Sequence, residues 1–507
     1  MLLLGLAWSL ACGDRTADHR DSDQDAGLDA DQDAEPDAEA EVDLDAGQDA
    51  GDETGATDQG DDIGEAELDG LEHADAEFEP EIEPEPQCNN GVKEQGEECD
   101  GQDFGDATCE DYGLVSGKLT CTDGCTIDSS TCAECGDGAC EPGESVASCP
   151  TECGVVDIAA GPVHTCAALR DGSVVCWGAR AGHRLGGSGD VNRPLWVPAI
   201  IGATKVACGA AHSCALLDTG QVACWGRNGF GEVGTGENSR EVFPPRTVPG
   251  LPPLARIAAG EHHSCASTVS GAVYCWGRGD FGSLGNGQLT MRRPTPVQVT
   301  GVSGTEKLTA GRQHTCALGN SLHCWGHNDH GQIGTGNQLW QSTPHDLTGA
   351  AFGVGAGYNH TCATFLRPAR PIHFSGLFCW GSNGYGQLGA APTPNWLGPQ
   401  RIAATTSRNI AGGRAHTCVV DVYDPGVPVC WGGNDFGQLG DGTQESRYAP
   451  GPVGGITTST VITAGQEHTC VILDDQTVRC WGRNHKGQLG DGSDAPLSTT
   501  PVEPVGL

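Results

Sequence analysis

The sequence predicts an all-β protein: a seven-bladed β-propeller preceded by a disordered acidic tether and small disulfide-rich modules. A phrase with His-x-Cys, followed downstream by Cys-Trp-Gly, occurs seven times. Its Trp residues follow one another at intervals of 48 to 55 residues, and a period near 50 is typical of repeat architectures. The 78 glycines and two methionines fit turn-rich strands better than helices. The seven phrases begin at His164, His212, His263, His314, His360, His416 and His468.

Residues 1–12 resemble a signal peptide, because the apolar run is too short to span a bilayer and ends in small residues. The ending Ser9-Leu10-Ala11-Cys12 is similar to a bacterial lipobox, whose Cys is lipid-modified. We therefore expect lipid attachment at Cys12, with the protein on the extracellular face of a bacterial outer membrane or secreted. The alternative is an ordinary secretory signal with a chance Cys, since no Lys or Arg precedes the run and Ser9 replaces the usual Leu.

Residues 13–87 are a low-complexity stretch of Asp, Glu, Ala, Gly and Pro, which predicts a disordered linker extended by charge repulsion. Residues 1–153 contain 45 acidic and 4 basic side chains, which accounts for the net charge of -41. Residues 154–507 contain 23 of each, so no basic face predicts a nucleic-acid partner. Calcium binding by the spaced Asp residues is an alternative, but the EF-hand placement of Gly and Glu is missing.

Residues 88–153 contain ten of the 26 cysteines, a density that indicates an oxidising compartment. The ten fall into groups of six and four, even numbers that allow closed disulfide frameworks, although the connectivity cannot be derived. The opening, from Cys88 to Asp100, resembles Cys-rich surface repeats of myxobacterial-type secreted proteins. Zinc is the competing interpretation, because Cys121-x3-Cys125 and Cys149-x3-Cys153 have ligand-like spacing, but the segment contains no His.

Each repeat is predicted to contain a β-hairpin around a short turn, as around Gly172 in the first repeat. The two Cys of most repeats are separated by 8, 10 or 12 residues, so they can face each other across a hairpin with an odd-length loop. Three-residue hairpin loops favour a left-handed conformation at their last residue. Gly172, Gly220 and Gly271 occupy that position in the first three repeats, and Gln476 occupies it in the last repeat.

This spacing predicts one cross-strand disulfide in each repeat, with a longer, irregular hairpin loop in the fifth. Cys208 has no partner in its repeat and is predicted to be a buried free thiol. The predicted pairs are Cys166–Cys176, Cys214–Cys224, Cys265–Cys275, Cys316–Cys324, Cys362–Cys379, Cys418–Cys430 and Cys470–Cys480.

The alternation of a strand puts each His on the same face as the first Cys and each Trp on the face opposite the second Cys. Large side chains on both faces are expected of a sheet packed between two other sheets. Seven such sheets around one axis form a propeller, in which radial repetition protects the strand edges.

The repeat A-G-x-x-H-[ST]-C-A-L…C-W-G-x-N-x-x-G-Q-L-G-x-G resembles the regulator of chromosome condensation repeat, most clearly in residues 464–492. The resemblance covers residues 154–507 and implies a seven-bladed propeller of four-stranded blades. It also implies ring closure by the two ends of the domain, with residues 155–158 near residues 501–505. Nucleotide exchange and chromatin binding, known for the founding member, are not expected of a secreted, neutral domain.

Three motifs that suggest chemistry have simpler structural interpretations. The pattern G-x-G-x-x-G recurs at Gly384–Gly389 and Gly229–Gly234, but no helix follows, so we expect no bound nucleotide. One His per blade cannot assemble a compact metal site, so the seven His are expected to hydrogen-bond backbone within their blades. No nucleophile elbow is present. We expect no metal, no cofactor and no catalytic residue.

The leading hypothesis is a monomeric protein-binding propeller without catalysis, with a protein partner that the sequence does not identify. An extracellular hydrolase or lyase, or an inhibitor docking on a secreted enzyme, are the alternatives. Recognition is expected where loops interrupt the period, because insertions in repeats map to one face. Neutral drift in tolerant loops is the competing explanation. The candidate partner-binding residues are Arg367, Arg370, His373, Phe374, Tyr423 and Asp424.

Overall fold

The computed structural model describes residues 152–507, apart from 181–182, 186–191, 348, 367–375, 404–406 and 421–425, together with selected residues between 98 and 149. These residues belong to one compact unit, Glu83–Leu507. Among them, no helix combines the length and the apolar character needed to cross a membrane.

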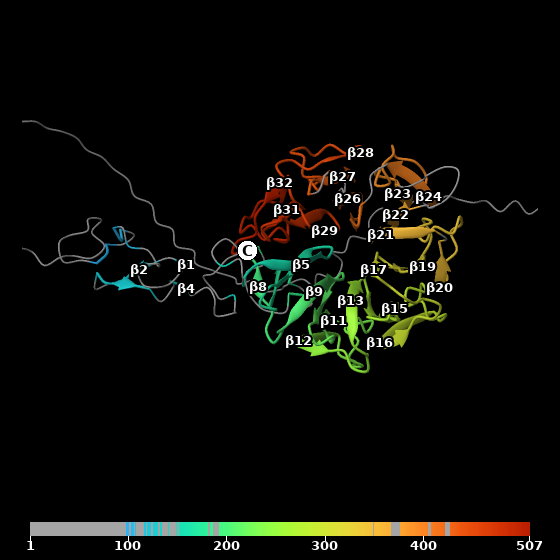
Figure 1. Cartoon of the computed structure of the whole chain (residues 1–507), viewed down its shortest axis with the longest axis horizontal. Coiled ribbons are helices and arrows are strands. Elements are labelled where there is room, and N and C mark those ends of the chain that lie inside the picture. Colours follow the sequence, from blue (N-terminus) through green and yellow to red (C-terminus); the bar gives the residue numbers. More distant parts are fainter. Residues whose placement is uncertain are drawn as a thin grey trace, which may run out of the picture. The chain divides into compact units, whose positions relative to one another are not determined.

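Seven four-stranded antiparallel sheets surround a common axis, which confirms the predicted propeller (Figure 1). Each sheet is a meander of four consecutive strands, the first of which lies at the centre of the ring. Blades 1 to 3 consist of β5 (Val155–Ala160), β6 (His164–Leu169), β7 (Val174–Gly178) and β8 (Leu195–Trp196); β9 (Ala203–Cys208), β10 (His212–Leu217), β11 (Val222–Arg227) and β12 (Glu241–Thr247); and β13 (Leu254–Ala259), β14 (His263–Thr268), β15 (Val273–Gly279) and β16 (Thr290–Gln298).

The remaining four blades repeat this order. They are β17 (Lys307–Ala310), β18 (His314–Leu318), β19 (Leu322–Gly326) and β20 (Gln341–Asp346); β21 (Ala350–Ala356), β22 (His360–Leu366), β23 (Gly376–Gly381) and β24 (Trp396–Ala403); β25 (Asn409–Gly412), β26 (His416–Val420), β27 (Pro428–Gly432) and β28 (Arg447–Pro452); and β29 (Val461–Ala464), β30 (His468–Ile472), β31 (Val478–Arg483) and β32 (Leu497–Val502).

The Cys-rich segment contains two small two-stranded sheets and confirmed disulfides. Strands β1 (Ser116–Gly117) and β4 (Cys132–Ala133) form one sheet, and β2 (Thr120–Cys121) and β3 (Ile127–Asp128) form the other. Cys99 pairs with Cys121 and Cys140 with Cys153, and Cys125 and Cys149 are also disulfide-bonded. Because all four of the cysteines considered as zinc ligands are oxidised, the zinc interpretation does not apply.

The second and third strands of every blade pair in the register that the Cys spacing predicted. The two Cys stand directly opposite each other, with Cα atoms 4.1 Å apart, and all seven blade disulfides are formed. Gly271 ends its hairpin loop at φ +83°, and a Cβ there would lie 2.0 Å from the Thr305 nitrogen. Gln476 adopts φ 70° at the equivalent place, so the last hairpin has the strained residue that the sequence indicated.

The hydrophobic core of the propeller is divided into seven clusters, one between each pair of adjacent blades. Each cluster combines the disulfide face of one blade with the Trp of the next, as Cys418 and Cys430 do with Trp481. All seven Trp side chains are at most 1% exposed. Neighbouring blades are therefore held together because the disulfide of one repeat packs against the Trp of the next repeat.

The ring closes by side-chain packing between the first and last blades, not by a shared sheet. Val155 and Ile158 of β5 belong to the same cluster as Ile472 and Leu507, and Val502 packs against that cluster. The two ends of the domain therefore meet as the family resemblance implied, with every blade complete in itself.

The meander gives the propeller two distinct faces. Turns between first and second strands and loops between third and fourth strands share one end of the blades, which we call the loop face. Hairpin turns between second and third strands and the connections between blades share the other end, the hairpin face. Chain segments from the seven repeats therefore converge at each end.

Candidate functional site

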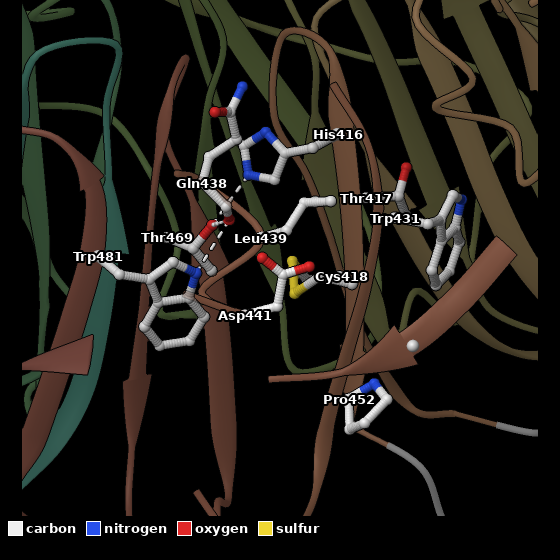
Figure 2. The surroundings of a disulfide bond; sticks show 12 residues. His416, Thr417, Cys418, Trp431, Gln438, Leu439, Asp441, Pro452, Thr469 and Trp481 are labelled. Carbon is white, nitrogen blue, oxygen red and sulfur yellow. Dashed lines mark hydrogen bonds between the residues drawn. A yellow bond between two sulfur atoms is a disulfide. The ribbon is translucent and has the colours of Figure 1, made fainter. Parts of the chain in front are cut away.

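The repeated His belongs to a hydrogen-bonded unit that joins neighbouring blades. In Figure 2, the His416 ring points to the Thr469 hydroxyl of the next blade, with Nε2 and Oγ1 2.9 Å apart. Thr469 and the Trp481 indole both donate to the Gln438 carbonyl, at 3.0 and 2.9 Å. Every blade has the same arrangement, and the His–hydroxyl distances are 2.8–3.0 Å. The prediction that each His bonds backbone within its own blade is wrong, because the acceptor is a side chain of the next blade.

The hydroxyl determines which tautomer the His adopts. A Thr or Ser hydroxyl has one proton, and here it is donated to the carbonyl, so its oxygen accepts a hydrogen bond from the His Nε2–H. Nδ1 is then unprotonated, and at His164, His314, His360, His416 and His468 it has no hydrogen-bond partner among the described residues. Burial lowers the pKa of His416 to about 3, so the ring is neutral. These rings are structural links between blades.

One group of side chains has metal-ligand geometry but cannot act as a metal site. Ligand atoms of His164, Cys166 and Cys208 lie within 4.8 Å of one another. Cys166 is oxidised in its disulfide, and His164 Nε2 is engaged with Ser213. Cys208 is the buried free thiol that the sequence predicted, and burial raises its pKa to about 12. Its thiol donates to the Ala159 carbonyl at 3.4 Å, so neither a thiolate nor an open ligand position is available.

The recurring G-x-G-x-x-G pattern is a tight turn on the loop face that its own side chains organise. In blade 5, Gln387 Oε1 accepts the Tyr385 amide at 2.9 Å, and Asn383 Oδ1 accepts the Leu388 amide at 3.0 Å. The strand that precedes the loop leads into a further strand, not a helix. These amides are therefore satisfied within the protein, and the loop is no phosphate cradle.

The residue that precedes the G-x-x-G turn in these loops is aromatic in four blades, as Phe230, Phe281, Tyr385 and Phe436. In blades 2 to 4, aromatic side chains of the loop face form a continuous array. The Arg278 guanidinium lies 4.9 Å from the centre of the Phe230 ring and 5.0 Å from the centre of the Phe281 ring. Phe281 packs edge-on against Trp340, with ring centroids 4.9 Å apart. His262 packs on Phe230 at 5.1 Å. We call Phe230, His262, Arg278, Phe281, His327, Asp329 and Trp340 the aromatic ladder.

Hydrogen bonds fix the outer end of the aromatic ladder. Asp329 accepts the Trp340 indole N–H at 2.6 Å and lies 3.0 Å from His327 Nε2. Trp340 nevertheless remains 43% exposed, and the neighbouring Leu339 is 68% exposed. An exposed Trp whose position is fixed by a hydrogen bond, together with aromatic rings and an Arg that lies over two of them, matches the side-chain composition of protein-binding hot spots.

Ion pairs surround the loop-face mouth of the central channel, next to the aromatic ladder. Arg312 pairs with Glu261 at 3.0 Å and stacks on Tyr358, whose hydroxyl also reaches Glu261. On the opposite side Glu467 lies 2.5 Å from Arg483. This end of the channel is lined mainly by the Ala and Gly that end the innermost strands, such as Ala160. Among its described lining residues the one carboxylate is Glu261, which pairs with Arg312, and the one thiol is Cys208, whose pKa is raised by burial.

Comparisons with known proteins agree with this geometry. Two models of the regulator of chromosome condensation (RCC1) repeat match, one at residues 155–179, 203–232, 255–283 and 460–488, the other at 219–267, 270–318, 376–420 and 430–472. The blades are RCC1 repeats. Matched segments occur in the first and last blades, so the repeat extends around the whole ring.

Curated relatives share part of the RCC1-repeat region. The chain is 31% identical over 235 residues to the ultraviolet-B receptor UVR8 of Arabidopsis thaliana, covering 44% of this chain and 51% of the relative. It is 28% identical over 264 residues to the secretion-regulating guanine nucleotide exchange factor of Bos taurus, covering 45% and 55%. The alignments thus span about half the length of these curated relatives.

Solved structures show the same fold. Prp20p of Saccharomyces cerevisiae superposes with a TM-score of 0.57 at 23% identity, covering 65% of this chain and 85% of that one. Human WBSCR16 superposes with a TM-score of 0.56 at 21% identity, covering 66% and 94%. At these identities the likeness concerns the fold of the RCC1-repeat propeller alone.

The sequence-predicted partner-binding residues lie outside the described residues. Along the chain, Arg367, Arg370, His373 and Phe374 fall between β22 and β23, and Tyr423 and Asp424 fall between β26 and β27. Cys12 also lies outside the described residues. The loop-face array was missed, although Phe230 and Phe281, which precede the G-x-x-G turns of blades 2 and 3, were a visible signal.

Glu232 is the acidic member of a repeated position below the aromatic ladder, where blades 1 and 3 use Arg184 and Ser283. Four blades have Gln there: Gln332, Gln387, Gln438 and Gln488. Glu232 Oε2 accepts the Phe230 amide at 2.8 Å, but Oε1 has no hydrogen-bond partner among the described residues and lies 3.8 Å from His262 Nδ1. The side chain is 0% exposed, and this burial raises the pKa of its carboxyl group.

We expect Glu232→Gln to stabilise the protein by about 1–3 kcal/mol at pH 8, the cost of a buried unsatisfied group. A carboxyl group whose pKa is raised in the folded state destabilises it at high pH, and this cost vanishes below the unfolded pKa of 4.5. The gain should therefore shrink as the pH falls from 8 to 5, as measured by urea unfolding. The reverse substitution, Gln387→Glu, should destabilise the protein, most strongly at pH 8 and less as the pH falls. A stability gain of Glu232→Gln that does not depend on pH would contradict this account.

Proposed function

We propose that the protein is a non-catalytic scaffold that binds another protein through the loop face of its RCC1-repeat propeller, at the aromatic ladder. The observation that carries this proposal is the unbroken contact of Phe230, Arg278, Phe281 and Trp340 across three blades. Preorganised aromatic and Arg side chains lose little conformational entropy on binding, which favours them as anchors.

The exposed apolar side chains around the aromatic ladder support a protein partner. Leu289, Met291 and Leu339 lie in or next to the same loops and are 62%, 64% and 68% exposed. Such exposure at neighbouring blades is typical of an interaction surface. The Prp20p structure is described with binding to Gsp1p and histones, and another yeast structure has RCC1 (Prp20) bound to Kap60, so the fold serves protein binding elsewhere.

We place this scaffold outside the cytoplasm, on a bacterial surface or secreted, with residues 13–87 as its tether and Cys12 as its lipid anchor. The seven blade disulfides support an oxidising compartment. The partner is therefore to be sought among extracellular proteins. Its identity decides between a receptor-like scaffold and an inhibitor that docks on a secreted enzyme.

The experiment compares partner capture from an extracellular fraction by the full chain and by two loop-face variants, Trp340→Ala and Arg278→Ala. Each should weaken the affinity for a captured protein by about 30-fold, the loss of a hot spot worth about 2 kcal/mol. Trp196→Ala, which removes an equally exposed Trp of blade 1 (40%), is the matched control and should bind normally.

A variant of the sequence-predicted residues, Arg370→Ala with Phe374→Ala, distinguishes the two candidate binding surfaces. If this variant loses the partner while Trp340→Ala retains it, the partner binds through the sequence-predicted residues and the loop-face proposal is wrong. Turnover of a polysaccharide or peptide by the purified full chain would contradict the non-catalytic assignment and favour the hydrolase or lyase alternative.

A further inference from the structure

A second feature of the propeller, independent of the aromatic ladder, is a girdle of charged positions where the central channel opens on the hairpin face. In each blade, one residue of the first strand pairs with the residue of the second strand that lies two positions after the first Cys of the repeat. In blade 4, for example, Lys307 pairs with Leu318, two positions after Cys316. These seven equivalent positions carry Asp157, Lys205, Arg256, Lys307, Gly353, Asn409 and Val461. Cations therefore occupy three consecutive blades, and Arg408 precedes the position in blade 6.

The girdle side chains reach from one blade to the next. Lys307 Nζ donates to the Arg408 carbonyl, and Arg256 Nε donates to the Glu306 carbonyl. Lys307 thereby passes blade 5, where Gly353 provides no side chain and a Cβ would lie 2.2 Å from the Ser407 carbonyl. Neutral carbonyls satisfy these donors, but they do not neutralise the charges.

The cations exceed the carboxylates that face them. Within the described part of the chain, Asp157 forms the one ion pair of this girdle, with Lys205 at 4.0 Å, and it also accepts the Val206 amide. No described carboxylate lies within ion-pair distance of Arg256, Lys307 or Arg408, and the Glu306 side chain is exposed. Burial, followed by the charges of Arg408 and Lys205, lowers the pKa of Lys307 to about 8.

We propose that this mouth of the channel binds a small multivalent oxyanion, of the phosphate or polycarboxylate class, between Lys205, Arg256, Lys307 and Arg408. An anion there would contact cations from blades 2, 3, 4 and 6 and relieve their mutual repulsion. Charge-assisted hydrogen bonds to ammonium and guanidinium groups are the usual means of holding such oxyanions. Because the cations extend from innermost strands that surround the channel, a small anion suits the site better than an acidic protein surface.

The test measures binding of inorganic pyrophosphate, of citrate and, separately, of a Glu-rich peptide to the full-length protein by calorimetry at low ionic strength and pH 7. Saturable binding of pyrophosphate or citrate is expected, and the tighter of these two assigns the phosphate or the carboxylate class. Lys307→Met should weaken binding about tenfold or more, the loss of one charge-assisted contact. Lys205→Gln, at a half-exposed position where folding is not at risk, should weaken it in the same direction.

Lys486→Gln, which removes an exposed charge from the loop face, is the control and should bind as the unaltered protein does. Affinity should also fall between pH 7 and 9 as Lys307 loses its proton. The proposal is overturned if neither anion binds saturably, if Lys486→Gln weakens binding as much as Lys205→Gln, or if only a Glu-rich peptide binds. That last result would assign the girdle to an acidic protein segment.

Discussion

Acidification from pH 7 to pH 5 is expected to remove a large part of the free energy of unfolding, because seven buried His must stay neutral in the folded propeller. Their side chains are at most 1% exposed. Burial lowers the pKa to about 3 for His212, His263, His314, His416 and His468, to about 4 for His360, and well below 6.5 for His164. At pH 5 the imidazoles of the unfolded chain, with their ordinary pKa, are protonated, whereas those of the folded chain remain neutral.

The sign of this effect follows from proton linkage. A His whose folded pKa is lowered contributes its full stability above the unfolded pKa of 6.5, and that stability is lost as the pH falls through 6.5 towards 3. Each such group contributes a slope of about 1.4 kcal/mol per pH unit, so the seven together approach about 10 kcal/mol per pH unit near pH 5. No other group of residues in the described chain repeats a shift of this size in every blade.

Urea unfolding at a series of pH values, together with calorimetric proton uptake on unfolding, measures this slope. His416→Gln keeps a side-chain donor for Thr469 and should reduce the slope by about one seventh. His485→Gln, which removes an exposed His, should leave it unchanged. Uptake of fewer than about two protons at pH 5 would show that the His rings are protonated in the folded state.

Truncation of a single blade Trp is expected to cause the largest loss from one substitution in the core. Trp481→Ala should cost about 3–5 kcal/mol, because it opens a cavity between blades 6 and 7 and removes the indole donor of the Gln438 carbonyl. Trp481→Phe should cost less, since most of the buried ring is retained. Urea midpoints monitored by circular dichroism give both values.

The matched control is Trp340→Ala, which removes an exposed indole from the loop face and should change stability by no more than about 0.5 kcal/mol. If Trp340→Ala were as damaging as Trp481→Ala, the aromatic ladder would be part of the structural core, and its proposed role in binding would lose its basis. Equal stability of Trp481→Ala and the unaltered protein would show that the clusters between blades do not hold the ring together.

Local geometry explains why the disulfides were predictable. Whether Cys316 and Cys324 face each other depends on their sequence separation of 8 and on the pleat of two adjacent strands. The same local rule found the left-handed position that Gln476 occupies. Predictions of this kind need no knowledge of how one blade packs on another.

The His assignment failed because its partner lies a full repeat away. His360 bonds the hydroxyl of Thr417, 57 residues later, and His468 closes the ring by bonding Thr165. A visible signal was present, since every one of the seven His is followed by Ser or Thr. Only the rotation from one blade to the next places that hydroxyl above the preceding imidazole.

The sequence alone settles the number of blades, their hairpins, the pairing of their cysteines and the isolation of Cys208, because each depends on spacing along one chain segment. The tertiary structure decides which side chains meet. Closing the ring brings equivalent positions of separate repeats close together. On the loop face Arg278 therefore reaches both Phe230 and Phe281, and on the hairpin face Lys307 reaches the Arg408 carbonyl. Those contacts depend on the radial packing of sheets, which hydrophobic periodicity and residue spacing do not specify.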